Sequence, residues 1–228
     1  LHKAIRRQRQ MCIRDRYVPE LTTPEEREWT VNTNGSIGVD SRTNTLRPRA
    51  VPDSSGSAMV RISGTQLKKL IEMTENLDTA RALIIPTGQG SLKSLTLELP
   101  KLELNQMAYR SEVGLELRTP HGELILNTEA LQMLSNRMRS DFAALTLGAG
   151  DAADARTALG GVLPEGVTED QLEQAHVLRA SATSGSNKIT SLGEHRYTLR
   201  LPVEAGFAAA DPACTVLFAA EDGTVTTL

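Results

Sequence analysis

Aromatic side chains are scarce in this sequence: three Phe, three Tyr and one Trp make up 3% of its 228 residues. Rings usually dominate recognition surfaces and contribute much of the area that a core buries. Their scarcity argues against an aromatic platform for sugars or bases, and a core must rest on Leu, Val, Ile, Ala and Met. The chain is long enough to bury such a core, in one large domain or two small ones.

The motifs of common enzyme classes are also missing. The chain has no HExxH, no paired CxxC, no P-loop, no GxSxG and no GxGxxG after a strand, the patterns that accompany metal, phosphate, nucleophile and dinucleotide chemistry. No segment approaches the ~20 consecutive apolar residues that span a bilayer. We therefore predict that the protein is not an enzyme, uses no cofactor and does not insert into a membrane.

Histidines that could take part in chemistry lie far apart along the chain, at His121, His176 and His195. A general base or a metal ligand needs partners, and none is recognisable for any of the three. We interpret each as solvated or as a capping residue. The sequence thus assigns no catalytic and no cofactor-binding residue, and it leaves any binding surface unknown.

Acidic residues cluster in one stretch, at Asp151, Asp154, Glu165, Glu169 and Asp170. They lack the alternating spacing of a calcium loop and its bidentate Glu, so we expect a solvated loop and no metal site. Cys214 has apolar neighbours, which favours a buried strand position rather than a nucleophile.

The first sixteen residues, LHKAIRRQRQMCIRDR, carry a net charge of +5, which leaves −8 for residues 17–228. A basic arm for nucleic acid is one interpretation, because clustered Arg neutralises phosphates, and a solvated tail is another. However, RRQRQMCIRDR is also the codon-by-codon translation of DNA that resembles a transposase-type sequencing-library adapter. We therefore expect residues 1–16, including Cys12, to be an adapter-derived artefact, and we predict no nucleic-acid partner.

Residues 17–56 are polar and rich in Ser, Thr, Asn and Pro, which predicts a disordered linker. Regular patterns begin after it. AMVRI predicts a strand, and helical spacing of apolar residues follows in SGTQLKKLIEMTENLD, with Ser63 or Thr65 as the N-cap. A loose repeat of strand, short helix and strand then covers residues 95–119 and 122–147, joined by a hairpin turn at Thr119–Gly122.

The fold class expected from these patterns is α+β, with short helices packed on mixed or antiparallel sheets. We expect an α+β module over 57–147 and, after a Gly- and Ala-rich stretch, a β-rich module over 148–228 that is truncated at its C-terminus. Its last predicted feature is a hairpin around Asp222-Gly223. Ten residues are predicted to be core: Leu70, Ile71, Leu97, Leu99, Leu117, Leu126, Leu134, Leu145, Leu199 and Val216.

Two stretches together resemble a known family: the block from Val60 to Leu147, and ITSLGEHRYTLRLPVEAGFAAADPACTVLFAAEDGTVTTL. They are similar to the α+β stalk modules of large cell-surface proteins of Gram-positive, mostly anaerobic bacteria that carry S-layer homology repeats. In that family an "ITSFGG" strand precedes a "VTVTLPY" strand, and "DP" introduces a "VVYY" strand and a "DDG" hairpin. The counterparts here are Ile189–Gly193, Tyr197–Val203, Asp211-Pro212, Thr215–Phe218 and Glu221–Gly223.

The chain departs from that pattern at Phe218 and Ala219, where aromatic pairs are usual. The resemblance implies a non-enzymatic spacer module of an exported, S-layer-associated surface protein. Its expected location is the cell surface, and its expected partners are neighbouring domains of the same chain and possibly a cell-wall polymer. A glycan- or protein-binding module, which would use strand edges or the His121 turn, is the alternative, and an accessory domain of a cell-wall enzyme is a weaker one.

Overall fold

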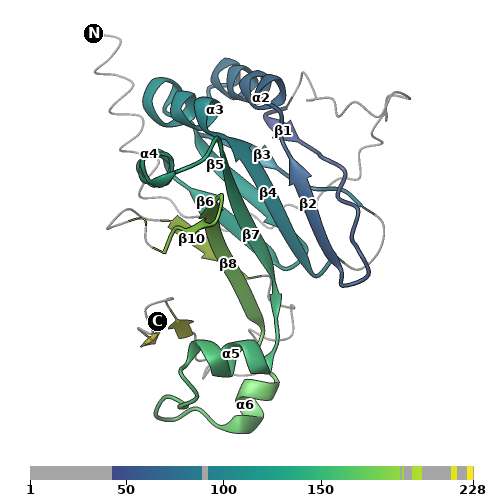
Figure 1. The fold of residues 1–228 in the computed structure, drawn as a ribbon, viewed down its shortest axis with the longest axis vertical. Coiled ribbons are helices and arrows are strands. Elements are labelled where there is room, and N and C mark those ends of the chain that lie inside the picture. Colours follow the sequence, from purple (N-terminus) through teal and green to yellow (C-terminus); the bar gives the residue numbers. More distant parts are fainter. Residues whose placement is uncertain are drawn as a thin grey trace. The chain divides into compact units, whose positions relative to one another are not determined.

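The computed structural model describes residues 43–88, 92–190, 192, 197–201, 217–219 and 225–227. By contacts the chain divides into two units, Leu1–Val31 and Asn32–Leu228, and all described residues belong to the second. This unit contains two five-stranded sheets and a set of short helices (Figure 1). The α+β class predicted from the sequence is confirmed.

Sheet I has the strand order β1-β3-β5-β6-β10. Its strands are β1 (Thr45–Leu46), β3 (Arg81–Ile84), β5 (Gly114–Thr119), β6 (Gly122–Leu126) and β10 (Tyr197–Arg200). The first three run parallel, and β6 and β10 each pair antiparallel. The predicted hairpin at Thr119–Gly122 is confirmed, because these two residues close the β5–β6 ladder.

Sheet II has the order β2-β4-β7-β8-β9. Its strands are β2 (Ser57–Arg61), β4 (Ser94–Pro100), β7 (Phe142–Gly150), β8 (Val177–Ser184) and β9 (Asn187–Lys188). β2 and β4 run parallel, and the other pairs are antiparallel. A separate antiparallel pair consists of β11 (Leu217–Ala219) and β12 (Val225–Thr227). This pair confirms the C-terminal hairpin; its turn, with Asp222-Gly223, lies outside the described residues.

Three helices each connect a strand of one sheet to a strand of the other. They are α2 (Gly64–Asn76), α3 (Lys101–Gln106), which continues as the π-helical turn η1 (Met107–Ser111), and α4 (Thr128–Arg137). Of the two candidate N-caps of α2, the structure selects Ser63, whose hydroxyl accepts from the Gln66 N–H in a capping box. The three helices lie together at one end of the sheets (Figure 1).

The units β2-α2-β3, β4-α3-β5 and β6-α4-β7 share one pattern of burial. Their helices follow the cap residues Ser63, Pro100 and Asn127. Apolar residues one and three positions before each cap, and four and seven positions after it, are all buried: Val60, Ile62, Leu67 and Leu70; Leu97, Leu99, Leu104 and Met107; Leu124, Leu126, Leu131 and Leu134. The repeat predicted over 95–119 and 122–147 is therefore present, and residues 57–84 form a third copy.

The core lies between the two sheets and beneath the three helices. Eight of the ten predicted core residues are at most 2% exposed: Leu70, Ile71, Leu97, Leu99, Leu117, Leu126, Leu134 and Leu145. Leu199 is partly buried against the same cluster, and Val216 lies outside the described residues. In a two-sheet core the inward residues alternate along each strand, which is why the leucine spacing in the sequence identified them.

The linker expected over residues 17–56 ends earlier than predicted. The backbone from Asn44 to Ala50 bonds along β3, with the Leu46 carbonyl accepting from the Ile85 N–H at 2.9 Å and the Ala50 N–H donating to Thr87 at 2.6 Å. Leu46 is fully buried and Ala50 is 2% exposed. A proline and two arginines lie between these two apolar residues. For that reason the sequence pattern resembled a linker, although the segment forms a short edge strand. Residues 17–42 lie outside the described part.

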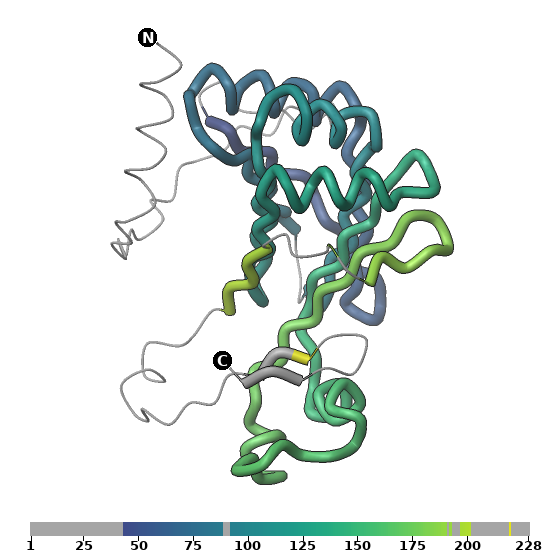
Figure 2. The backbone as a smooth tube through the Cα atoms, turned by 90° about the vertical axis from the view of Figure 1, so that its left-hand side faces the viewer, coloured from purple at the N-terminus to yellow at the C-terminus, as the bar shows by residue number. Residues whose placement is uncertain are grey.

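The division expected between residues 147 and 148 does not separate two cores. β7 runs through it, β8 continues sheet II, and β10 continues sheet I. The Gly- and Ala-rich composition marks instead the end of the β7–β8 ribbon, where a small lobe carries α5 (Ala152–Ala158) and α6 (Glu169–Glu173). Figures 1 and 2 show this lobe at the end of the ribbon remote from α2, α3 and α4.

Candidate functional site

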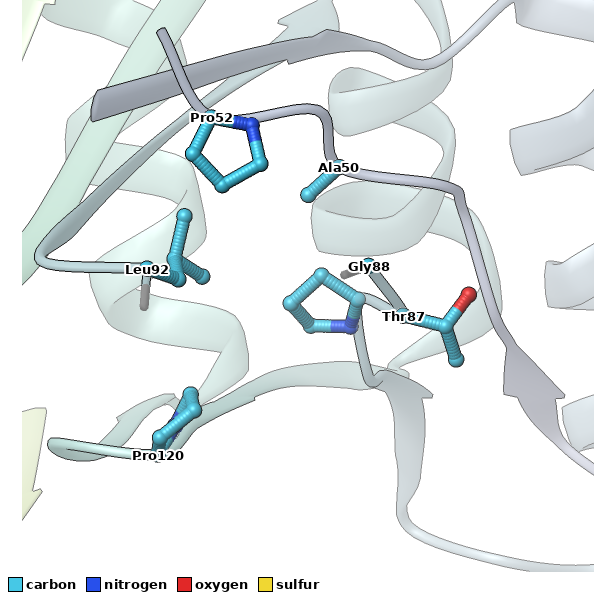
Figure 3. Close-up of a pocket in the computed structure, with 7 residues that line it drawn as sticks. Ala50, Pro52, Thr87, Gly88, Leu92 and Pro120 are labelled. Carbon is cyan, nitrogen blue, oxygen red and sulfur yellow. The ribbon is translucent and has the colours of Figure 1, made fainter. Parts of the chain in front are cut away.

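A small hollow lies at the end of the sheets opposite the helices. Its volume is about 80 Å³. Three loops form it, and its lining residues are Ala50, Pro52, Pro86, Thr87, Gly88, Leu92 and Pro120. Figure 3 shows Ala50 and Pro52 on one side of the hollow and Pro120 on the other.

Most side chains that line this pocket are apolar, but polar atoms form nearly as much of its surface as apolar atoms do. Three of its lining residues are prolines, and Thr87 supplies the one hydroxyl among the lining side chains. That hydroxyl donates to the Pro48 carbonyl at 3.5 Å. Functional pockets usually measure ~300–1,000 Å³ and contain several convergent polar groups. The hollow fits a single small apolar group, such as one aliphatic side chain.

His121 lies beside this pocket, in the β5–β6 turn. Its Nε2 contacts the Leu92 carbonyl, and its backbone N–H donates to the Thr119 hydroxyl at 3.3 Å. The Thr119 hydroxyl in turn donates to the Gly122 carbonyl at 3.0 Å. These bonds hold the turn against the segment that precedes β4. The ring of His121 thus contacts a backbone carbonyl that is distant along the chain, a contact that the sequence did not predict.

The other candidates from the sequence do not come together. Exposed His176 follows α6, whereas His195, Cys214 and Cys12 lie outside the described residues. Among the residues that the structure describes, no group of three or more His, Cys, Asp or Glu side chains could hold a metal ion.

Acidic residues of the 151–170 stretch cap and brace the lobe. Asp151 and Asp154 form the capping box of α5, and the Asp154 carboxylate also accepts from Arg179 at 3.0 Å. Arg156 donates to Glu169 at 2.6 Å, and hydrogen bonding to this carboxylate raises the pKa of the Arg156 guanidinium. The sequence predicted a solvated loop here, and the structure adds two short helices held by these contacts.

Sheet I carries a ladder of charges that the sequence analysis missed. It crosses four neighbouring strands, through Arg81, Glu116, Arg118, Glu123 and Arg200. Glu116 is the buried member, since its side chain is 4% exposed, and it accepts from two arginines at 3.2 and 2.5 Å. Alternating charges in GLELRT and GELIL were the available signal, but a sequence does not state which strands are neighbours.

Comparison with known proteins gives no further identification: no family model matches the chain, and no curated protein or solved structure matches it significantly. Within the described residues, no helix has both the length and the apolar character needed to cross a membrane. The candidate site is therefore defined by geometry alone, as a small hollow beside the β5–β6 turn.

Proposed function

We propose that the chain is a non-enzymatic structural module that spaces or displays neighbouring domains of an exported bacterial cell-surface protein. The observation that supports this most is the use of its charged side chains. Glu116 and Glu123 brace sheet I, Asp151 and Asp154 cap α5, and Glu98 pairs with Arg61 across sheet II at 2.6 Å. These carboxylates are thus engaged in holding strands and helices in place.

The two-sheet architecture also suits a spacer. Sheets I and II share one core, and three helices each connect a strand of one sheet to a strand of the other, so the two sheets pack as one unit. The resemblance to stalk modules of S-layer-associated proteins adds the expected location, at the cell surface. The expected neighbours are the other domains of the same chain.

Cell-wall sedimentation tests this proposal against the glycan-binding alternative. Purified walls from a Gram-positive bacterium are mixed with the full chain and pelleted, with an unrelated acidic protein as the control. A spacer stays in the supernatant like the control. Saturable retention on the walls contradicts the spacer role and supports a binding module.

The pocket beside His121 provides the specific observation for a protein-binding module as a second candidate. The apolar side chains that line it can contact an aliphatic side chain of a peptide. Leu92→Ala enlarges the hollow, whereas Leu102→Ala removes a leucine that is 76% exposed elsewhere. If a peptide occupies the pocket, only the first variant changes its affinity.

Turnover measurements test the non-enzymatic part of the proposal. The full chain is incubated with peptidoglycan and with ester and peptide substrates, and release of products is followed. We expect no turnover above the buffer rate. Activity that a His121→Ala variant abolishes would overturn the proposal and support the accessory enzyme domain instead.

A further inference from the structure

Strand β8 has one unpaired edge. β7 pairs with it from Val177 to Thr183, whereas β9 pairs on the other side only at Thr183 and Ser184. The Ile189 N–H donates to the Ala182 carbonyl at 2.8 Å, so the backbone groups of Ala182 face away from β7. Successive residues of a strand bond to opposite sides. The N–H and C=O groups of Leu178 and Ala180 therefore face away from β7 too, where no described strand pairs with them.

The core is also uncovered along this edge. Ala180 lies opposite Leu147 in the β7–β8 register, on the face of sheet II that points into the core. Leu147 is fully buried, but Ala180 is exposed and Leu178 is only partly buried. A further strand beside β8 would cover this row.

The edge lacks the features that ordinarily prevent strand addition. Natural edges are blunted by proline, by bulges or by charges that point inward. Residues 177–182 contain no proline, and the inward residues Leu178, Ala180 and Ala182 are apolar. The one charge, Arg179, alternates to the opposite face and donates to Asp154 at 3.0 Å. The open edge of β8 is therefore competent to pair.

The hairpin of β11 and β12 is a strand pair in need of such an edge. An isolated two-stranded hairpin is marginally stable in water and needs a third strand or a packed face. The chain between Leu201 and Leu217 can span up to ~50 Å when fully extended, at ~3.3 Å per residue. This length is enough for the hairpin to reach the edge of β8. Ala219 of β11 is apolar, as are the inward residues Leu178 and Ala180 of β8.

We propose that β11 adds to the open edge of β8, so that the hairpin of the same chain extends sheet II. The backbone of β11 pairs with the outward N–H and C=O groups of Leu178 and Ala180. Its Ala219 then continues the apolar row of sheet II beyond Leu178 and Ala180.

Amide hydrogen exchange tests the proposal, with the full chain compared with a chain that ends at Leu201. In the full chain the amides of Leu178 and Ala180 exchange slowly, and in the shortened chain they lose this protection. The Ser181 amide, which faces β7, is the internal control and stays protected in both chains. Free exchange of Leu178 and Ala180 in the full chain overturns the proposal, as does equal protection in the two chains.

A matched pair of substitutions tests the same contact without shortening the chain. Ala180→Pro removes the outward N–H and leaves the groups that bond β7, whereas Ala180→Val keeps the N–H. We expect the Leu178 amide to lose protection in the proline variant and to keep it in the valine variant. Protection that rises with protein concentration, together with a dimer mass by light scattering, assigns the added strand to a second copy and overturns pairing within one chain.

Discussion

Replacing Glu116 by Gln tests the charge ladder of sheet I at its buried member. The substitution keeps the shape of the side chain and removes its charge. Arg81 then loses its carboxylate partner at 3.2 Å, and Arg118 retains only Glu123, at 3.3 Å. The change is therefore confined to one group that lies between two strands, β3 and β6, on the outer face of the sheet.

The substitution should lower the free energy of unfolding by more than the loss of a surface ion pair does and by less than the loss of a buried one. Removing one partner of a fully buried ion pair costs ~3–5 kcal/mol, whereas exposed pairs contribute ~0.2–1 kcal/mol each. Glu116 is 4% exposed, but Arg81 and Arg118 are 44% and 42% exposed and remain solvated after the substitution. We therefore expect Glu116→Gln to lower the free energy of unfolding by about 2 kcal/mol, which lowers Tm by about 4–8 °C in a domain of this size.

Urea unfolding followed by circular dichroism measures this loss, and Glu98→Gln is the matched control. Glu98 also pairs across strands, but with the single Arg61, whose side chain is 62% exposed. We expect the control to cost less than ~1 kcal/mol and to lose its effect at about 1 M salt, where the Debye length is ~3 Å. An equal cost for the two variants, or a Glu116→Gln effect that salt abolishes, would refute the reasoning.

Three further predictions concern the core, a helix cap and acid. Leu97→Ala should cost ~2–5 kcal/mol in urea unfolding because Leu97 is fully buried, whereas Met59→Ala in the neighbouring strand, 67% exposed, should cost less than ~0.5 kcal/mol. Ser63→Ala should lower stability by ~1 kcal/mol, and Thr65→Ala, at the rejected cap position, by clearly less. Hydrogen bonds from the Ser55 hydroxyl and from backbone lower the pKa of Asp53; the stabilisation is present above the unfolded pKa and is lost as pH falls through the folded one. Melting curves of wild type and Asp53→Ala should therefore converge in acid.

The sequence predicted those local features that depend only on residues close to one another along the chain. Helix α2 follows from apolar spacing and a cap, and the structure places Leu67, Leu70 and Ile71 on its buried face. The β5–β6 hairpin follows from a turn signal between two strands. The contact of the His121 ring with the Leu92 carbonyl was not predicted, because nothing in the sequence names the carbonyl.

Long-range pairing was not predictable in the same way. The segments ARALIIPT and SLKSLTLELP are each typical of a strand, and the Gly-rich stretch between them is typical of a turn that would pair them. The strands belong to different sheets, β3 to sheet I and β4 to sheet II. Alternation tells which residues of a strand point inward, but two sheets around one core present the same alternation. For that reason the sequence could not assign Glu116 and Arg81 to neighbouring strands.

The third copy of the repeat, residues 57–84, was recognised only in the structure. The sequence predicts a strand and a helix within residues 57–84 but not their membership of the repeat, and the three cap residues Ser63, Pro100 and Asn127 are chemically different. Pro100 forms no side-chain cap bond, whereas Ser63 and Asn127 do. The three units therefore share the distances from the cap to the buried residues and not the chemistry of the cap. Those distances are set by the need of each helix to cover the core between two sheets. The spacing of apolar residues before and after the cap is therefore the feature that all three copies share.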